Sequence, residues 1–368
     1  MQPTFLNATG IFVPPYCISN QVLVDAYNRY ADYFNLENSA SIDVGQVAAK
    51  KRSDNEYIVA HSGITQRYFV TNEGVLDPDV MCPLLPEIDE EHTSLMAEMG
   101  VNAAMQALQK VSRRGDQIDL IIVAASHVQR PYPALAIEIQ HLLGAKGLAF
   151  DLCAAECSAV VAMQLASQAI GCGQASRALI ISPEIGSAQT DFRDRDTHYL
   201  LGDACSALLL ENEPNGDALA LLGVHCASQF SNQIRNNFGF LNRLAPDSLY
   251  GKDKLFHQTP PSFSLIVDAV ASHSRQHLSQ LGLNQEQISQ VFLQPTNLCL
   301  NQQIGQALLG QSKGRQLPDC VAQYGGTGAA GLGLSYHLHQ DLSQGQYCQW
   351  LGFGAGYSIA SAIFQKAN

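Results

Sequence analysis

The 368-residue chain has little positive charge and no long apolar run. It carries 21 Lys and Arg residues against 33 Asp and Glu residues, a formal net charge of −12. Nucleic-acid surfaces need clustered basic residues to neutralise phosphate, so a nucleic-acid partner is excluded. No stretch approaches the roughly 18 apolar residues of a membrane helix, so no membrane partner is expected. The first residues lack the basic start and apolar stretch of a secretory signal, and the expected location is cytoplasmic.

Paired cysteine spacing is also absent, although the chain has ten cysteines. They are scattered, and most lie in apolar stretches, where cysteine behaves as a small hydrophobic residue. The closest pair, Cys153 and Cys157, has no second Cys or His pair beside it. Four such ligands make up the usual structural zinc site, so we expect no metal.

The composition is that of a globular protein with a large core, with 46% hydrophobic and 15% charged residues. A polar turn at residues 213–217 separates two segments with a similar order of elements. The first segment holds expected strands at 118–125, 148–152 and 177–182 and an expected helix at 157–170. The second segment holds an expected strand at 288–293, a helix at 298–309 and a short strand at 320–323. A helix at 329–339 and a pair of apolar strands at 347–363 follow.

Apolar strands that alternate with helices and end in glycine turns predict an α/β fold with a largely parallel, buried sheet. The duplicated order predicts two pseudo-equivalent halves, residues 1–213 and 214–368, packed into one core. A polar insertion at about residues 25–60 begins in an expected helix at 21–34. It is either a cap near an entrance or, more simply, a solvated surface insertion.

The segment at residues 150–159 places Cys157 where a buried strand turns into the first turn of a helix. Free N–H groups and the positive end of the helix dipole stabilise a thiolate at such a position. The same N–H groups would bind the oxyanion of a thioester. A small buried cysteine in a tight turn accounts for these residues equally well.

The run AFDLCAAECSAVVAMQLA resembles the nucleophile turn of the ketoacyl-synthase III branch of the thiolase superfamily, with Cys157 as the nucleophile. Other segments resemble that family in its own order, at residues 53–67, 130–140, 192–204, 231–243 and 352–358. The segment from residue 231 is similar to a subgroup that uses medium-chain acyl groups. The resemblance covers essentially the whole chain and implies a thiolase fold, with two βαβαβ halves in a layered α-β-α-β-α core.

The resemblance also implies a reaction without a cofactor. Cys157 would take an acyl group from CoA or from acyl carrier protein. The glycine loop that contains Gly354 and Gly356 would supply one oxyanion N–H, that of Ala355, beside the N–H of Cys157.

Further roles follow from the same resemblance. Tyr57 and His61 belong to the segment that is similar to the acyl-CoA site, and Asn297 is a further substrate-binding position. Tyr132 matches an aromatic residue that closes the acyl tunnel of the partner subunit in a dimer.

Three positions around the expected site depart from the family's pattern, in addition to Cys299 described below. Gln294 stands at the position of the catalytic His and Gly326 at that of the catalytic Asn. Glutamine donates a hydrogen bond but transfers no proton at neutral pH, and glycine has no side-chain donor, so decarboxylative condensation should be impaired. Glu156 stands beside the nucleophile, where a carboxylate would raise the pKa of a thiol, serve as a replacement base, or point away into a polar pocket.

Two functions are compatible with these residues. The first is an acyltransferase that passes an acyl group from Cys157 to an acceptor in fatty-acid, polyketide or specialised lipid biosynthesis. The alternative is a catalytically degenerate subunit of a heteromeric ketosynthase. The predicted assembly is accordingly a homodimer or a heteromer with an intact ketosynthase. A carrier-protein partner is less well supported, because Cys299 replaces an Arg of the family's basic patch.

Overall fold

A computed structural model describes residues 2–85, 91–236, 257–258, 263–310 and 316–367 of the chain. Its described part is organised around a nine-stranded sheet. Across the sheet the strands are β11 (Ile288–Leu293), β12 (Tyr347–Gly354), β13 (Ser358–Lys366), β8 (Leu219–Ser228), β1 (Phe5–Phe12), β7 (Asp203–Glu211), β6 (Arg177–Ile185), β4 (Leu120–Ala124) and β5 (Leu148–Leu152).

The sheet is mixed, which corrects the prediction of a largely parallel one. Strand β4 is parallel to β5 and β6, and β11 is parallel to β12. Every pairing between β12 and β6, through β13, β8, β1 and β7, is antiparallel. At one point the reason is the connection: Gly354 pairs with Ser358 across a turn at 355–357, and so short a turn joins only antiparallel strands.

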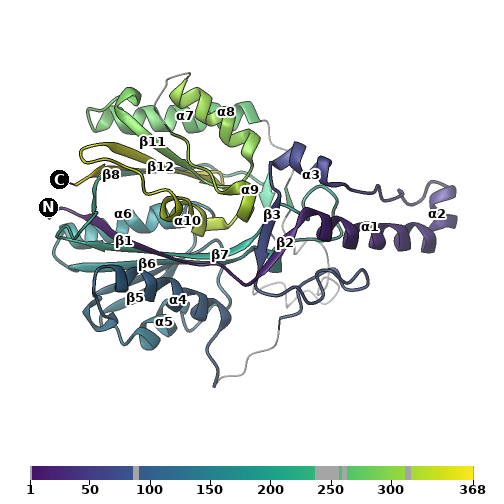
Figure 1. Cartoon of the computed structure of the whole chain (residues 1–368), viewed down its shortest axis with the longest axis horizontal. Helices are drawn as coiled ribbons and strands as arrows, with labels where there is room; N and C mark the ends of the chain where they lie inside the picture. The colour runs from purple at the N-terminus through teal and green to yellow at the C-terminus, as the bar shows by residue number, and fades with distance from the viewer. Residues whose placement is uncertain (1, 86–90, 237–256, 259–262, 311–315, 368) are drawn as a thin grey trace.

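The helices form three layers, and two groups of strands of the nine-stranded sheet lie between them (Figure 1). Helices α4 (Leu95–Lys110) and α5 (Leu135–Leu143) cover one outer face, and α7 (Phe263–Gln280) and α8 (Leu298–Leu309) cover the other. Helices α6 (Ser158–Gly171) and α10 (Gly331–Leu338) lie between the two groups of strands. The predicted α-β-α-β-α layering and thiolase fold are therefore confirmed.

The two groups of strands meet where β1 pairs with β8 through only two residue pairs, Phe5 with Ala220 and Leu6 with Leu219. Strands up to Glu211 lie on one side of this junction and strands from Leu219 onward on the other. The predicted boundary at residue 213 falls in the connection between them. The division of the chain into halves at that residue stays a prediction.

The middle helix α6 is held in the core by a stripe of small and apolar side chains. Cys157, Val160, Met163, Ala166 and Ile170 are spaced three or four residues apart and belong to one buried cluster. Residues at that spacing lie on one face of a helix, so the stripe packs as a unit. This stripe fixes how the strand-to-helix turn before α6 is oriented.

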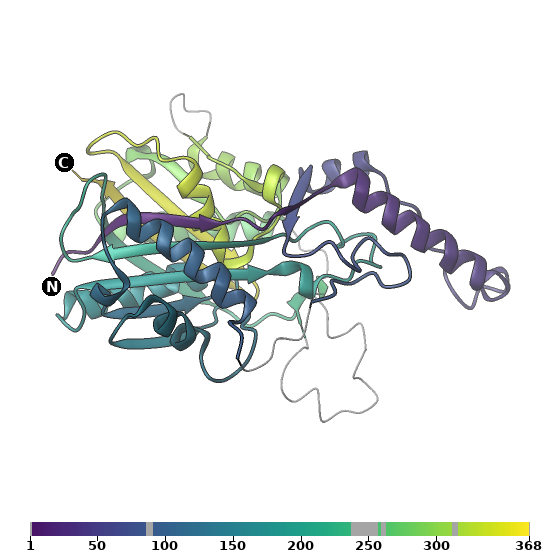
Figure 2. The same ribbon diagram turned by 60° about the horizontal axis from the view of Figure 1, so that its bottom comes forward.

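The predicted insertion is a helical arm. Helix α1 (Asn20–Glu37) starts at Ser19, whose hydroxyl accepts a hydrogen bond from the N–H of Val22. The helix runs out from the body and ends in α2 (Ser39–Asp43), and the chain returns to α3 (Asn55–Ser62) (Figures 1 and 2). The arm's base is held by the pairing of β2 (Tyr16–Ser19) with β3 (Gln66–Phe69). Its tip points away from the body, as a solvated insertion would.

One expected element has the wrong type. The predicted strand at residues 320–323 is the short helix α9 (Val321–Tyr324). The side chain of Asp319 accepts a hydrogen bond from the N–H of Val321 at 2.6 Å, which satisfies a free donor of a helical first turn. The segment is too short for its apolar pattern to distinguish a helix from a strand.

Candidate functional site

A cavity of about 780 Å³ lies at the end of α6 nearest the β12–β13 turn. The two-stranded sheet of β9 (Ile234–Arg235) and β10 (His257–Gln258) contributes to its lining, as do α7, α8 and the ends of β8 and β12. Most of the lining is apolar: Leu200, Leu201, Phe230, Ile234, Phe263, Leu265, Ile266, Val270, Leu300, Phe353 and Ile359. A cavity of this size and lining is typical of small-molecule sites.

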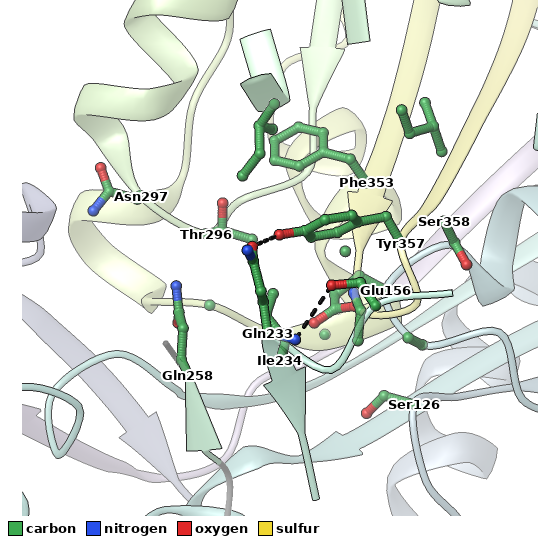
Figure 3. Close-up of a pocket in the computed structure, with 18 of the residues that line it drawn as sticks. Ser126, Glu156, Gln233, Ile234, Gln258, Thr296, Asn297, Phe353, Tyr357 and Ser358 are labelled. Atoms are coloured by element: carbon green, nitrogen blue, oxygen red, sulfur yellow. Dashed lines mark hydrogen bonds between the residues drawn. The ribbon is translucent and has the colours of Figure 1, made fainter. Parts of the chain in front are cut away.

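Glu156 is the residue that the turn before α6 directs into the cavity (Figure 3). The preceding Ala155 has a φ of 49°, which reverses the chain tightly. The hydroxyl of Ser158 ties the turn together by accepting from the N–H of Ala154 at 2.8 Å. The Oε2 atom of Glu156 accepts a hydrogen bond from the N–H of Ala355 at 2.9 Å. Burial raises the pKa of the Glu156 carboxyl.

Cys157 lies at the N-cap of α6, as predicted, but its thiol faces the core instead of the cavity. Its side chain is 1% exposed and does not line the cavity. Burial, followed by the charge of Glu156, raises the pKa of the Cys157 thiol well above its ordinary value. A nucleophilic thiol needs a lowered pKa and access to substrate, so this position corrects the expectation that Cys157 meets an acyl donor.

The apolar stripe on α6 is the sequence signal that could have separated Cys157 from Glu156. Cys157 continues the spacing of Val160 and Met163 back to the helix start, so it belongs to the buried face. Glu156 breaks that apolar pattern and so falls on another side of the turn.

Gln294 does not take part in the cavity lining. It follows β11, is fully buried, and its amide nitrogen donates to the carbonyl of Gly328 at 2.6 Å. The expectation that its amide would point at a substrate is therefore not met. Gly326 does line the cavity, and its backbone is held to Leu200 and Gly202 by hydrogen bonds of 2.8 and 2.9 Å.

The glycine loop lies where it was expected, beside the turn that precedes α6. Gly354 and Ala355 line the cavity, and the N–H of Ala355 points inward. A Cβ atom added at Gly354 would lie 1.8 Å from Oε2 of Glu156, so only glycine fits opposite this glutamate. Gly356 has a φ of 134° and does not line the cavity. The loop's inward donor is thus already engaged by a side chain of the same protein.

A second buried carboxylate, Glu184 of β6, also lines the cavity and was missed by the sequence analysis. It accepts hydrogen bonds from the N–H of Ser126 at 2.6 Å and from the N–H of Ala329 at 3.0 Å. Burial raises its pKa to about 7. His127, which a hydrogen bond joins to Ser126, lies 3.5 Å from Glu184, and burial lowers the pKa of this histidine to about 4. Glu184 lies within an apolar strand, and its charge is the only feature in the sequence that marks it as unusual there.

Two of the predicted acyl-CoA contacts lie away from the cavity. The hydroxyl of Tyr57 donates to Asp196 at 2.6 Å, and its ring lies 3.5 Å from the guanidinium carbon of Arg195 and 4.0 Å from the ring of His61. Neither Tyr57 nor His61 lines the cavity. The Tyr57 ring is already engaged by its neighbours and offers little free face for stacking a base.

Asn297 and Tyr132 occupy different surroundings. Asn297 lines the cavity, and its amide donates to the carbonyl of His61 at 2.6 Å while its oxygen accepts from the N–H of Leu300. Tyr132 lies in the connection between β4 and α5, and its side chain is 78% exposed. Contact of Tyr132 with a partner subunit stays a prediction.

The described residues hold no group of three or more His, Cys, Asp or Glu side chains that could bind a metal ion. Within the same residues, no helix is long and apolar enough to cross a membrane.

Comparison with known proteins gives the family. Residues 150–229 match the profile of 3-oxoacyl-[acyl-carrier-protein (ACP)] synthase III, and residues 278–366 match the profile of its C-terminal part. The β-ketodecanoyl-[acyl-carrier-protein] synthase of Pseudomonas aeruginosa is 37% identical over 349 residues, which cover 93% of this chain and 100% of that protein. The β-ketoacyl-[acyl-carrier-protein] synthase III 2 of Lactiplantibacillus plantarum is 32% identical over 75% of this chain and 85% of its own length.

Solved structures agree in fold. The crystal structure of 3-oxoacyl-[acyl-carrier-protein] synthase III from Aquifex aeolicus superposes with a TM-score of 0.77 at 20% identity, and the match covers 98% of this chain and 99% of that one. The fold, the extent of the sequence match and the place of the glycine loop all agree. The chain belongs to the 3-oxoacyl-[acyl-carrier-protein] synthase III family.

Proposed function

We propose that this chain is a catalytically degenerate family member that binds an acyl-like chain without being acylated and acts as a subunit beside an intact ketosynthase. One observation carries the proposal. The side chain that the turn before α6 presents to the cavity is Glu156, and its carboxylate already binds the N–H of Ala355. A thioester oxygen would need that same donor during acylation.

The other positions of the expected catalytic set support the same function. The thiol of Cys157 is buried in the core, away from the cavity. The amide of Gln294 donates its hydrogen bond to the carbonyl of Gly328, and Gly326 has no side chain that could donate one. Loss of one oxyanion donor costs about 10²–10³ in rate, so the loss of several leaves little condensation.

The retained cavity supports the acyl-binding part of the proposal. A subunit with no ligand has no need for an apolar cavity of about 780 Å³, and an empty one weakens the fold. The name of the Pseudomonas aeruginosa relative specifies a β-ketodecanoyl product. We therefore take a chain of about ten carbons as the first candidate for the occupant.

Acylation of the purified protein tests this function. The chain is incubated with octanoyl-CoA and with the short thioester octanoyl-N-acetylcysteamine, which removes any need for a nucleotide site, and is then weighed intact. We expect no acyl adduct on the wild type. We expect Glu156→Cys to become acylated at position 156, because that substitution frees the N–H of Ala355 and places a thiol in the cavity.

Cys157→Ser is the matched control and should behave as the wild type does. An adduct on the wild-type protein that maps to Cys157 and disappears in Cys157→Ser would overturn the proposal in favour of an acyltransferase. Iodoacetamide labelling of the native protein gives a second measurement. It should modify the exposed Cys17, Cys82, Cys153 and Cys172 and spare the buried Cys157.

A further inference from the structure

The cavity has walls of two kinds. Apolar side chains from α7, α8 and β12, among them Ile266, Leu300 and Phe353, form one part. Glu156 and Glu184 belong to the other part, beside Ser126. In Figure 3 Phe353 lies on one side and Ser126 on the other, with Glu156 between them. An occupant that satisfies both parts needs an aliphatic chain and a polar head.

The donors around the polar part are already used within the protein. The N–H of Ala355 binds Glu156, and the N–H groups of Ser126 and Ala329 bind Glu184. The hydroxyl of Thr296 also lines the cavity, and its Oγ1 atom is buried without a hydrogen-bond partner among the described residues. This part of the cavity therefore offers a ligand the carboxylate oxygens as acceptors and the Thr296 hydroxyl as either a donor or an acceptor.

The charged side chains at the cavity also favour a ligand whose head donates hydrogen bonds. Arg235 is the one cationic side chain among the described residues that line the cavity; it lies on an exposed part of β9 and donates to Asn232 at 3.5 Å. Glu184 is buried and Glu156 is half-buried, and the charge of Glu156 adds to the burial that raises the pKa of Glu184. A ligand carboxylate would add a third acid to this region, whereas a cation would offset the charge already there.

We propose that the cavity binds a medium-chain aliphatic molecule whose head donates hydrogen bonds, with a protonated primary amine preferred over a neutral ester and over a carboxylate. This inference rests on the proposed function, because a site that holds no covalent acyl group is free for such a ligand. Glu156 is the side chain that decides the preference, since it stands between the apolar walls and Glu184.

Calorimetric titration with four decyl probes at neutral pH tests the proposal: decylamine, 1-decanol, methyl decanoate and decanoic acid, each below its micellar concentration. We expect decylamine to bind most tightly, and at least about tenfold more tightly than decanoic acid. That ratio corresponds to one charge-assisted hydrogen bond. Decanol should lie between the amine and the methyl ester, because its hydroxyl is a neutral donor.

Glu156→Gln is the decisive variant. It keeps the size of the side chain and changes the surface of the protein very little, so adventitious attraction of an amine to an acidic protein should remain. We expect the ratio of amine to acid affinity to fall by about tenfold or more. Ala269→Trp, which fills the apolar part of the cavity instead, should weaken all four probes together while it leaves their order unchanged.

Decanoic acid or methyl decanoate binding as tightly as decylamine would overturn the inference, as would an amine preference that survives Glu156→Gln. Either result leaves the proposed function standing, because that function is tested by the absence of a thioester adduct. Conversely, acylation of the wild-type protein would remove the proposed function whatever the order of the decyl probes.

Discussion

Glu156 and Gly354 fit together, because the carboxylate of Glu156 lies where Gly354 has no side chain. The carboxylate lies against the backbone of the glycine loop, in the space that any Cβ atom at Gly354 would need. The carboxylate of the half-buried Glu156 is held by the N–H of Ala355, so relief of a clash at Gly354 would have to break that hydrogen bond. The fit of these two residues determines whether the turn before α6 and the β12–β13 turn can both keep their places.

Gly354→Ala should therefore destabilise the protein by about 1–3 kcal/mol, the usual cost of overpacking a filled interior. Its control is Gly352→Ala on the same strand, where the added Cβ would meet the nearest atoms of Cys157 at an ordinary 3.5 Å. Denaturant unfolding of both variants measures the difference. Adding Glu156→Ala to Gly354→Ala should recover most of the loss, and a Gly354→Ala protein as stable as the control would contradict this packing.

The residues that sequence reasoning placed correctly are those whose role depends on the backbone. Ala355 was expected to supply an oxyanion N–H; this N–H follows a buried strand, lies at the cavity and binds Glu156, and its role toward a substrate stays a prediction. Cys157 and Gln294 were expected at the substrate because of their chemistry, and both are in the core. Side-chain direction at a turn depends on one or two dihedral angles, such as the φ of 49° at Ala155, which the sequence does not reveal.

Among the described elements, β11 and β5 are the two terminal strands of the nine-stranded sheet. An isolated bridge joins Gln290 of β11 to Gln316, whereas β5 pairs with β4 and has no other strand partner among the described residues. Its first residue, Leu148, is 63% exposed, and the exposed Tyr132 lies in the connection that precedes α5. An open edge with exposed apolar side chains favours strand pairing with another chain. The predicted dimer is therefore best placed at β5.

Leu148→Lys should convert a dimer into a monomer at micromolar concentration, because it puts a charge in the apolar contact. Leu36→Lys is the matched control, an identical change at a leucine that is 74% exposed on the arm. Light scattering gives the mass of each variant. A monomer produced by Leu36→Lys and not by Leu148→Lys would move the interface from the sheet edge to the arm.

Elements with a strong internal pattern were predicted nearly to the residue. The strand at 148–152 and the helix at 298–309 have the bounds that the sequence indicated. The antiparallel strands β1, β7 and β8 were not predicted, and β7, which is buried at every position, shows no alternation of buried and exposed side chains. Which strands are neighbours depends on contacts between distant parts of the chain, and a local pattern carries no information about them.

For the whole molecule, buried histidines tie stability to pH. Burial lowers the pKa values of His127, His198, His277 and His337 to about 4, so between pH 4 and 6.5 the unfolded chain holds more protons at these sites. Stability from these groups is complete above pH 6.5 and is lost as the pH falls. Glu184, with a pKa raised to about 7, acts in the opposite sense over the upper part of this range.

These histidines contribute a decline in the unfolding free energy on acidification from pH 6.5 toward pH 4, whereas Glu156, Glu184, Asp203 and Asp319, whose pKa values burial raises, oppose it. Urea unfolding at half-unit steps of pH measures the slope. His337→Gln should make the decline less steep, because it removes one group that takes up a proton only on unfolding. A slope that is unchanged in His337→Gln would mean that the pKa of this histidine is the same in the folded and the unfolded chain.

Strand β1 also has a consequence for synthesis on the ribosome. It is among the first segments to be made, yet it lies between β7 and β8, and β7 begins about 190 residues later. At about 5–20 residues per second, β1 waits roughly 10–40 s for its first sheet neighbour. During that interval an apolar segment is exposed without its hydrogen-bonding partners. Slow stretches of translation before residue 203 would lengthen this exposure, and chaperones would find a binding segment there.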